Sequence, residues 1–260
     1  MESYRLEGQT FVIDDYDRKP AFSSFLPGLA GVKGIPLWTF YTNRGQGMNS
    51  FGIDNKGNAI MEFNSANTAF ENTQVKGFRT FLKIDGEYYE PFFTYEKEAK
   101  RQMRMNKNSF KIIETNEKYG IEVTVNYYVL PNESIGALVR QVSVKNIGDS
   151  AKEVQVIDGL PKIITYGIAN GEFKEMSNLF KSWADIRNLE NKVPYYTLRA
   201  STKDSAEVSD VEGGYYYLTV RDGKLQDVIY DVDTVFGYDL SLMTPVNFID
   251  GSIEGVLSKE

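Results

Sequence analysis

The stretch Ile121–Val129 reads IEVTVNYYV and alternates apolar with more polar side chains along its whole length. Successive side chains of a β-strand point to opposite faces of its sheet, so a period of two gathers the Ile, the Val residues and the first Tyr on one face. Most of these residues are also β-branched or aromatic, the types that strands favour. The stretch therefore predicts a strand with one buried face, as is typical of an antiparallel sheet.

Similar strand patterns recur on both sides of this stretch, separated by turn residues. Residues 43–47 (NRGQG) connect two such patterns, and Asp85-Gly86 connects two more, which predicts two hairpins. In all, we expect further strands at residues 37–42, 48–53, 59–63, 78–84, 88–93, 138–145, 154–157, 195–200, 215–221 and 227–230. This succession predicts an all-β fold, built as a large two-layer antiparallel β-sandwich.

One segment departs from the strand pattern. Between residues 172 and 188, apolar side chains recur every three to four positions, which predicts an amphipathic helix with Asn170 as a cap at its start. We interpret it as a short crossover helix that packs on the sheet. A helix that binds a partner is the alternative.

Composition limits the classes of function. With 260 residues, 42% of them hydrophobic, the chain is long enough for one large core, and no linker divides it, so we expect a single domain over residues 1–260. The net charge of -7 argues against a nucleic-acid partner. The most basic stretch, residues 97–107, also carries carboxylates and is interpreted as a solvated strand and loop. No leader and no run of about 18 apolar residues is present, so we expect a cytoplasmic protein without a membrane partner.

The sequence contains neither Cys nor His. Disulfides, thiolate or imidazole metal sites, and nucleophiles activated by histidine are therefore excluded. The acidic cluster Asp14, Asp15 and Asp17 lacks the ligand spacing of a calcium loop, and Arg18 supplies a neighbouring counter-charge. We accordingly predict no metal site.

Several stretches together resemble one family. In order and spacing, residues 11–17 (FVIDDYD), 22–29 (FSSFLPGL), 37–52 (LWTFYTNRGQGMNSFG) and 78–91 (FRTFLKIDGEYYEP) resemble the N-terminal region of glycoside phosphorylases of the cellobiose, chitobiose and 1,2-β-oligoglucan group. Residues 139–161 (VRQVSVKNIGDSAKEVQVIDGLP) resemble the second half of that domain. Residues 176–200, which carry NLENKVPYYTLRA from Asn188, are similar to the 1,2-β-oligoglucan branch. Residues 59–64 (AIMEFN) depart from the Arg-rich strand of cellobiose-type members, which disfavours cellobiose and chitobiose as substrates.

The resemblance implies a fold and a role. The fold is a supersandwich like that of galactose mutarotase, here as the N-terminal domain of an inverting phosphorylase. Such an enzyme uses inorganic phosphate as co-substrate, needs no further cofactor, and transfers glucosyl units from β-glucan oligosaccharides to that phosphate. Because phosphate is already a nucleophilic anion, one general acid suffices.

In the family, the acid is an Asp in a following helical (α/α)6 barrel, which these residues do not contain. We therefore expect no catalytic residue here and no turnover by this chain alone. The resemblance implies instead a scaffold that packs on the catalytic helical domain of the same polypeptide and contributes to a homodimer.

Six residues are candidates for sugar or interface contacts: Trp38, Asn43, Arg44, Gln46, Asp15 and Arg18. The Trp38 ring suits the apolar face of a sugar, with core packing as the alternative. Arg44 and Gln46, at the hairpin tip, are expected either to reach a sugar hydroxyl or the neighbouring subunit, or to form a solvated turn. A stand-alone carbohydrate-binding β-sandwich module is the alternative function. An aldose-epimerase-like activity is disfavoured because those enzymes use His for proton transfer.

Overall fold

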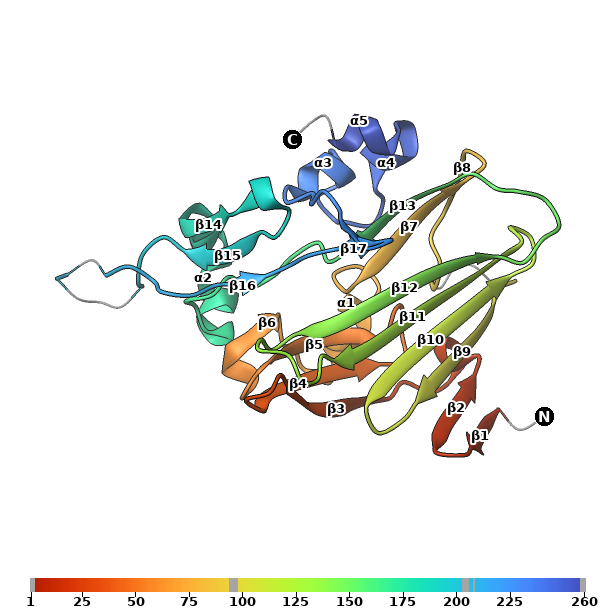
Figure 1. Cartoon of the computed structure of the whole chain (residues 1–260), viewed down its shortest axis with the longest axis horizontal. Coiled ribbons are helices and arrows are strands. Elements are labelled where there is room, and N and C mark those ends of the chain that lie inside the picture. The colour runs from red at the N-terminus through yellow and green to blue at the C-terminus, as the bar shows by residue number, and fades with distance from the viewer. Residues whose placement is uncertain (1–2, 94–97, 203–205, 208, 258–260) are drawn as a thin grey trace.

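The computed structural model describes residues 3–93, 98–202, 206–207 and 209–257 (Figure 1). Strands account for 39% and helices for 18% of the structure, and the strands are arranged in several antiparallel sheets. The predicted β class is therefore confirmed. The expectation of a single helix is wrong, because the described residues contain five α-helices.

The largest sheet has six strands and surrounds the stretch IEVTVNYYV. Its strands, in spatial order, are β1 (Tyr4–Glu7), β2 (Thr10–Asp14), β9 (Lys100–Met105), β10 (Ser109–Asn116), β11 (Ile121–Val129) and β12 (Leu138–Asn146). Strand β11 has the predicted bounds, and Val125 in it pairs with Ile112 on one side and Val142 on the other. Every second side chain from Ile121 to Tyr127 is buried, as a period of two requires.

A four-stranded sheet shares its core with the six-stranded one. Its strands are β3 (Ser23–Ala30), β4 (Ile35–Thr42), β5 (Met48–Ile53) and β6 (Ala59–Met61), in chain order. Leu26 and Met48 from this sheet lie in the same hydrophobic cluster as Ile13, Met103 and Ile112 from the larger sheet. The two sheets therefore bury one common apolar interior.

A three-stranded sheet supports the C-terminal helices. It consists of β13 (Val154–Gly159), β7 (Arg79–Ile84) and β8 (Glu87–Tyr89), in that order. Helices α3 (Val232–Phe236), α4 (Val246–Asp250) and α5 (Ile253–Leu257) lie together beside it (Figure 1). Phe81 of β7 shares their hydrophobic cluster with Phe236 and with Phe248, which is fully buried.

The remaining elements of the described residues belong to none of these three sheets. They comprise the short 3-10 helices η1 (Tyr16–Arg18), η2 (Lys56–Asn58) and η3 (Leu189–Asn191), helices α1 (Ala66–Asn72) and α2 (Asn170–Trp183), a sheet of β14 (Ala184–Arg187), β15 (Tyr195–Leu198) and β16 (Tyr215–Tyr216), and the pair β17 (Val220–Arg221) and β18 (Lys224–Leu225). No helix in the described part of the chain is long and apolar enough to cross a membrane.

The predicted crossover helix is present, but its limits differ from the prediction. Phe173 and Phe180 pack in a second hydrophobic cluster with residues of β6 and β15, so α2 does pack on sheet residues. The helix ends at Trp183 instead of residue 188, because the next four residues pair with β15. Asn170 is not the cap. Ala169 holds that position, and the Asn170 side chain accepts a hydrogen bond from the backbone of Phe63.

Some strand predictions were also wrong. Residues 227–230 form no strand, and only two short pieces of 215–221 do, β16 and β17. Six strands lie in segments that were not predicted as strands: β1, β2, β3, β10, β14 and β18. Strand β9 lies in the basic stretch that was interpreted as a strand and loop. The basic stretch at residues 97–107 is not simply solvated, because Arg101 is only 4% exposed. Lys97, the first residue of that stretch, lies outside the described residues.

Candidate functional site

The hairpin tip at residues 43–47 folds inward onto the protein. Asn43 is fully buried, and its Nδ2 donates to the carbonyl of Tyr16 (2.9 Å) while its Oδ1 accepts from the backbone of Phe22 (2.9 Å). The Arg44 guanidinium donates to the carbonyl oxygens of Asn43 (2.8 Å) and Lys19 (3.3 Å). The expectation of a solvated turn is therefore wrong. Asn43 and Arg44 fasten the segment that follows β2 to the hairpin.

Two glycines allow this close approach. Gly45 and Gly47 both have positive φ angles, 49° and 82°, which side chains disfavour. A Cβ on Gly47 would overlap the ring of Phe110 in β10, so only glycine lets the hairpin lie against the six-stranded sheet. The buried hydroxyl of Tyr16 also donates to the carbonyl of Gly45 (2.7 Å).

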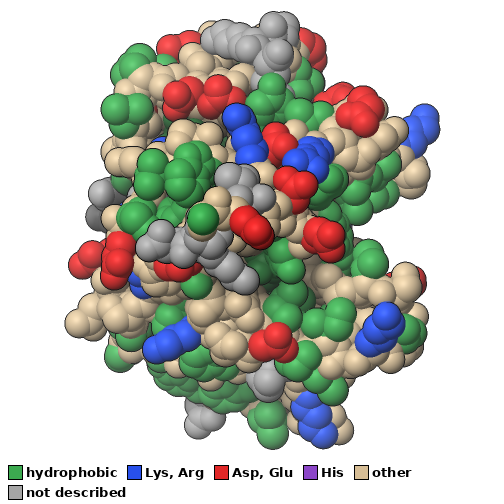
Figure 2. All heavy atoms as spheres, turned by 90° about the vertical axis from the view of Figure 1, so that its left-hand side faces the viewer, with side chains coloured by type: hydrophobic (Ala, Val, Ile, Leu, Met, Phe, Trp, Pro, Cys, Tyr) green, Lys and Arg blue, Asp and Glu red, His purple; other side chains and the backbone are tan. Residues whose placement is uncertain are grey.

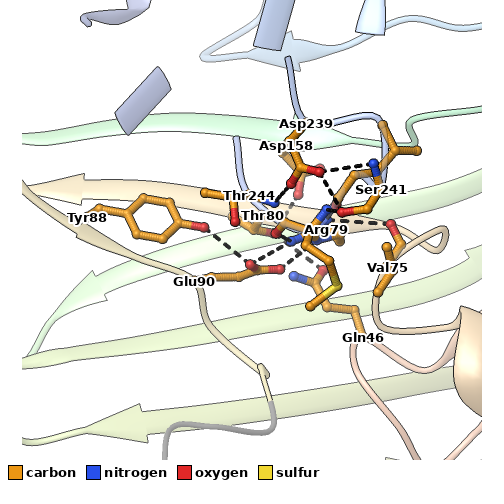
Figure 3. A network of polar contacts seen from close by, with 12 residues as sticks. Gln46, Val75, Arg79, Thr80, Tyr88, Glu90, Asp158, Asp239, Ser241 and Thr244 are labelled. Carbon is orange, nitrogen blue, oxygen red and sulfur yellow. Dashed lines mark hydrogen bonds and ion pairs between the residues drawn. The ribbon is translucent and has the colours of Figure 1, made fainter. Parts of the chain in front are cut away.

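Gln46 enters a buried polar network, here called the Arg140 cluster: Gln46, Thr80, Tyr127, Arg140 and Asp158. Arg140 makes a two-point ion pair with Asp158, with Nε to Oδ2 at 3.0 Å and Nη2 to Oδ1 at 2.7 Å. Its guanidinium also donates to the Gln46 side-chain oxygen and to the Tyr127 hydroxyl. Thr80 donates to Asp158 (2.6 Å), and Figure 3 shows Gln46, Thr80 and Asp158 converging.

The Arg140 cluster joins three sheets. Arg140 and Tyr127 belong to the six-stranded sheet, Thr80 and Asp158 to the three-stranded sheet, and Gln46 to the hairpin of the four-stranded sheet. Burial by itself would lower the pKa of Arg140, but Asp158 and Tyr127 outweigh it and raise that pKa above its ordinary value. The guanidinium therefore stays charged and keeps its partners in place.

A second buried pair ties β7 to the C-terminal segment. Arg79 binds Glu90 through two contacts, Nε to Oε1 at 2.7 Å and Nη2 to Oε2 at 2.8 Å (Figure 3). It also donates to the carbonyl oxygens of Leu242 and Met243. Burial raises the pKa of Glu90, while Arg79 counteracts this rise. Since Arg79 occupies both carboxylate oxygens, Glu90 serves as a structural anchor.

A third buried group of charged side chains, Arg101, Glu114 and Asp17, lies close to Asp15 and Arg18. Arg101 contacts Glu114 (2.5 Å) and Asp17 (2.6 Å), and all three side chains are at least nine-tenths buried. Asp15 has a left-handed backbone (φ 49°) and its N–H donates to the carbonyl of Arg101. Asp15 and Asp17 therefore share no strand face, because the chain turns into η1 there. Arg18 lies exposed on that turn.

Trp38 lies in β4, away from the hairpin tip. It is half-buried, packs against the second hydrophobic cluster, and donates from Nε1 to the carbonyl of Asn55 (3.1 Å). Its ring meets Phe63 edge-on at 5.8 Å between centroids, and Phe63 and Phe40 both contact Phe25. We call Phe25, Trp38, Phe40 and Phe63 the aromatic patch. Phe25 is its most open member, with 52% of its surface exposed.

The six predicted residues therefore do not converge on one site. The hairpin residues face the protein interior, Asp15 and Arg18 lie on the η1 turn, and Trp38 lies in the aromatic patch. The buried carboxylates described above each face an arginine, which suits charge neutralisation better than proton transfer. The described residues also contain no cluster of three or more His, Cys, Asp or Glu side chains able to hold a metal.

One hollow was missed by the sequence analysis. It lies between β5, the connection from β6 to α1, and the start of α2, and the residues that matter to its chemistry are Asn49, Glu62, Asn64, Lys76, Lys162 and Phe173. Its only sequence signal was the segment AIMEFN, which was noted as a departure from a family pattern and contributes Glu62 and Asn64. The lysines come from segments far apart in the chain, so no local motif marks them.

No protein-family model matches the chain. No curated protein sequence matches it either.

Proposed function

We propose that this chain is the non-catalytic N-terminal scaffold and dimerisation domain of an inverting glycoside phosphorylase, nearest the 1,2-β-oligoglucan branch. The parent enzyme transfers glucosyl units from β-glucan oligosaccharides to inorganic phosphate. Its fold is a two-layer supersandwich, its catalytic helical domain belongs to the same polypeptide, and the protein works in the cytoplasm. The order and spacing of the family-like stretches are the starting point of this proposal.

The Arg140 cluster is the observation that carries the scaffold role. Its charged and polar side chains contact one another across three sheets, and the side chain of Arg140 is only 7% exposed. A catalytic carboxylate needs access to substrate, whereas Asp158 is held by two contacts from one guanidinium. Such an arrangement suits a rigid support. The common core of the four- and six-stranded sheets supports the two-layer part of the proposal.

Exposed apolar side chains support the existence of a partner surface. On α2, Met176, Leu179 and Trp183 are 44%, 47% and 40% exposed. Figure 2 looks onto the side of the molecule where α2 lies and shows hydrophobic side chains gathered among charged ones. A second domain that packs there would remove this apolar surface from water.

The test is to assay this chain with and without the polypeptide encoded downstream of it. We expect the joined protein to release phosphate from glucose 1-phosphate in the presence of a β-1,2-glucan acceptor, and this chain alone to release none. Inactivity of the joined protein with every β-glucoside would contradict the proposal, as would turnover by this chain alone.

The aromatic patch favours a second candidate function, a stand-alone carbohydrate-binding module. Aromatic rings stack on the apolar faces of sugars, and Phe25 and Trp38 offer partly open rings on one sheet. Titration of this chain with β-1,2-linked glucose oligomers distinguishes the two functions. Binding that is lost in Phe25→Ala but kept in Phe11→Ala, an exposed aromatic of β2, would favour the module. If no oligomer gives a heat of binding, the module is contradicted and the scaffold remains the proposed function.

A further inference from the structure

The six-stranded sheet has an open edge at β1. Strand β1 is the last strand of that sheet, and no strand of the described residues pairs with its far side (Figure 1). On its near side it pairs with β2, and the backbone N–H of Asp14 donates to the carbonyl of Ser3, just before the strand. Since alternate residues of an antiparallel strand bond to opposite neighbours, the backbone groups of Tyr4 and Leu6 point to the open edge. Such an edge can pair with a further strand.

The apolar face of the same sheet extends to this edge. Leu6 lies opposite Phe11, and Tyr4 lies opposite Ile13, which belongs to the cluster shared by the four- and six-stranded sheets. These four side chains therefore point to the core side of the sheet. Leu6, Tyr4 and Phe11 are nevertheless 70%, 44% and 41% exposed, and the rings of Tyr4 and Phe11 stack at 6.4 Å between centroids. An apolar face left in water favours a partner that brings apolar surface of its own.

The other face of β1 carries charges of both signs. Arg5 Nε lies 2.7 Å from Glu7, and Arg5 also pairs with Asp14. Arg104 contacts the second carboxylate oxygen of Glu7 at 2.5 Å. Many edge strands carry charges, especially lysines, that discourage pairing with a copy of the same strand. One positive and one negative charge two residues apart act differently, because each can lie opposite the other in an antiparallel copy.

We propose that β1 pairs with β1 of a second copy of this chain, antiparallel about a two-fold axis at Leu6, so that two six-stranded sheets become continuous. Leu6 then lies opposite its own copy, and their outward N–H and C=O groups bond to each other. On the charged face, Arg5 lies opposite Glu7 of the second copy, and Glu7 lies opposite Arg5 of the second copy. An axis at Arg5 or at Glu7 would instead place like charges opposite each other.

The paired edges also bring the exposed apolar side chains together. The two copies of Leu6 meet at the axis, and Tyr4 and Phe11 of each copy extend the apolar face on either side. Strand β1 has four residues, so we expect an interface below about 1,200 Å² in total and a dimer that dissociates on dilution. The inference rests on the proposed dimerisation role, for which it names the surface.

Sedimentation velocity of the whole chain over a range of concentrations tests the pairing. We expect an equilibrium between monomer and dimer. Leu6→Lys should remove the dimer, because two ammonium groups would then meet at the axis. Leu240→Lys is the matched control and should leave the equilibrium unchanged, since Leu240 is also an exposed leucine (84%) but lies between α3 and α4.

Two charge reversals test the register. Arg5→Glu and Glu7→Arg should each weaken self-association at least about tenfold, because two pairs of opposite charges become two pairs of like charges. An equimolar mixture of the two variants should form dimers again, because the carboxylates of one variant then lie opposite the guanidinium groups of the other. Recovery in the mixture also shows that β1 is folded in both variants.

Three outcomes would overturn the inference: a chain that stays monomeric at every concentration, a dimer that Leu6→Lys leaves intact, or a mixture that associates no better than either variant alone. A dimer that survives Leu6→Lys would keep the proposed dimerisation role and assign it to another surface. The scaffold role itself is tested by phosphate release from the joined protein, so the two failures are distinguishable.

Discussion

Replacement of Arg140 by Met tests whether the Arg140 cluster holds the sheets together. The change keeps much of the apolar stem but removes the charge that pairs with Asp158 at 2.7 Å and 3.0 Å. Asp158 would then keep its carboxylate in a site where its side chain is only 22% exposed, and Gln46 and Tyr127 would each lose a bond. The consequence is a lower free energy of unfolding.

The magnitude follows from the burial of the two partners. Removal of one member of a fully buried ion pair costs about 3–5 kcal/mol. Because Asp158 retains some contact with water, we expect the lower limit, about 3 kcal/mol, for Arg140→Met. For a chain of this length, that loss corresponds to a fall in Tm of about 6–12 °C.

Urea unfolding followed by tryptophan fluorescence measures this change. Arg187→Met is the matched control, because Arg187 also pairs with a carboxylate, that of Asp185 at 2.8 Å, but its side chain is 50% exposed. An exposed pair is worth about 0–1 kcal/mol, so the control should unfold close to the unmodified chain. The double variant Arg140→Met with Asp158→Leu should regain at least about 1 kcal/mol, because no charge is left buried.

The reasoning would be refuted if Arg140→Met and Arg187→Met lowered the free energy of unfolding by the same amount. It would also be refuted if the double variant were less stable than Arg140→Met alone. In either case, the ion pair would not be the contact that joins the three sheets.

Three further measurements test other parts of the structure. The pKa of Asp239 lies below its ordinary value of 3.8 because the Ser241 hydroxyl and nearby backbone N–H groups donate to it. An NMR titration should therefore find a higher pKa in Ser241→Ala. Since the folded pKa is depressed, the stabilisation from this turn is complete above the ordinary pKa and is lost as pH falls through the folded value. Gly47→Ala should cost about 1–3 kcal/mol more than Gly86→Ala in urea unfolding, because both positions have positive φ but only the first meets an aromatic ring. Phe248→Ala should cost about 3–5 kcal/mol and speed proteolysis of the C-terminal helices, and an unchanged cleavage rate would contradict the packing described for them.

Local patterns predicted the strands with regular alternation. Strand β11 was predicted with its observed bounds, because the alternation of side chains reports directly which face is buried. Strand β5 was also predicted with its observed bounds, from the turn residues that precede it. The end of α2 was not predictable in this way. Ile186 continues the helical spacing, yet its backbone pairs with Tyr196 across the β14–β15 contact. Pairing with a neighbouring strand prevailed over the local preference.

The candidate residues show the same limit more clearly. The hairpin at residues 43–47 was predicted from its glycines, but whether its tip meets water depends on Phe110, more than sixty residues further along the chain. Likewise, Arg101 stands in a stretch that looks solvated, and its partners Asp17 and Glu114 lie in other elements. A charge run in sequence does not say which of its members the fold encloses.

By itself, the sequence determined the β class, the hairpins at residues 43–47 and 85–86, and the exclusion of chemistry that requires histidine or cysteine, because these follow from side-chain period, turn residues and composition. Only the tertiary structure decided that Gln46, Arg140 and Asp158 meet, and that Asn49 shares a cavity with Lys76 and Lys162. The physical reason is that buried polar groups are satisfied by partners brought together from distant segments, and those partners are set by how the sheets pack.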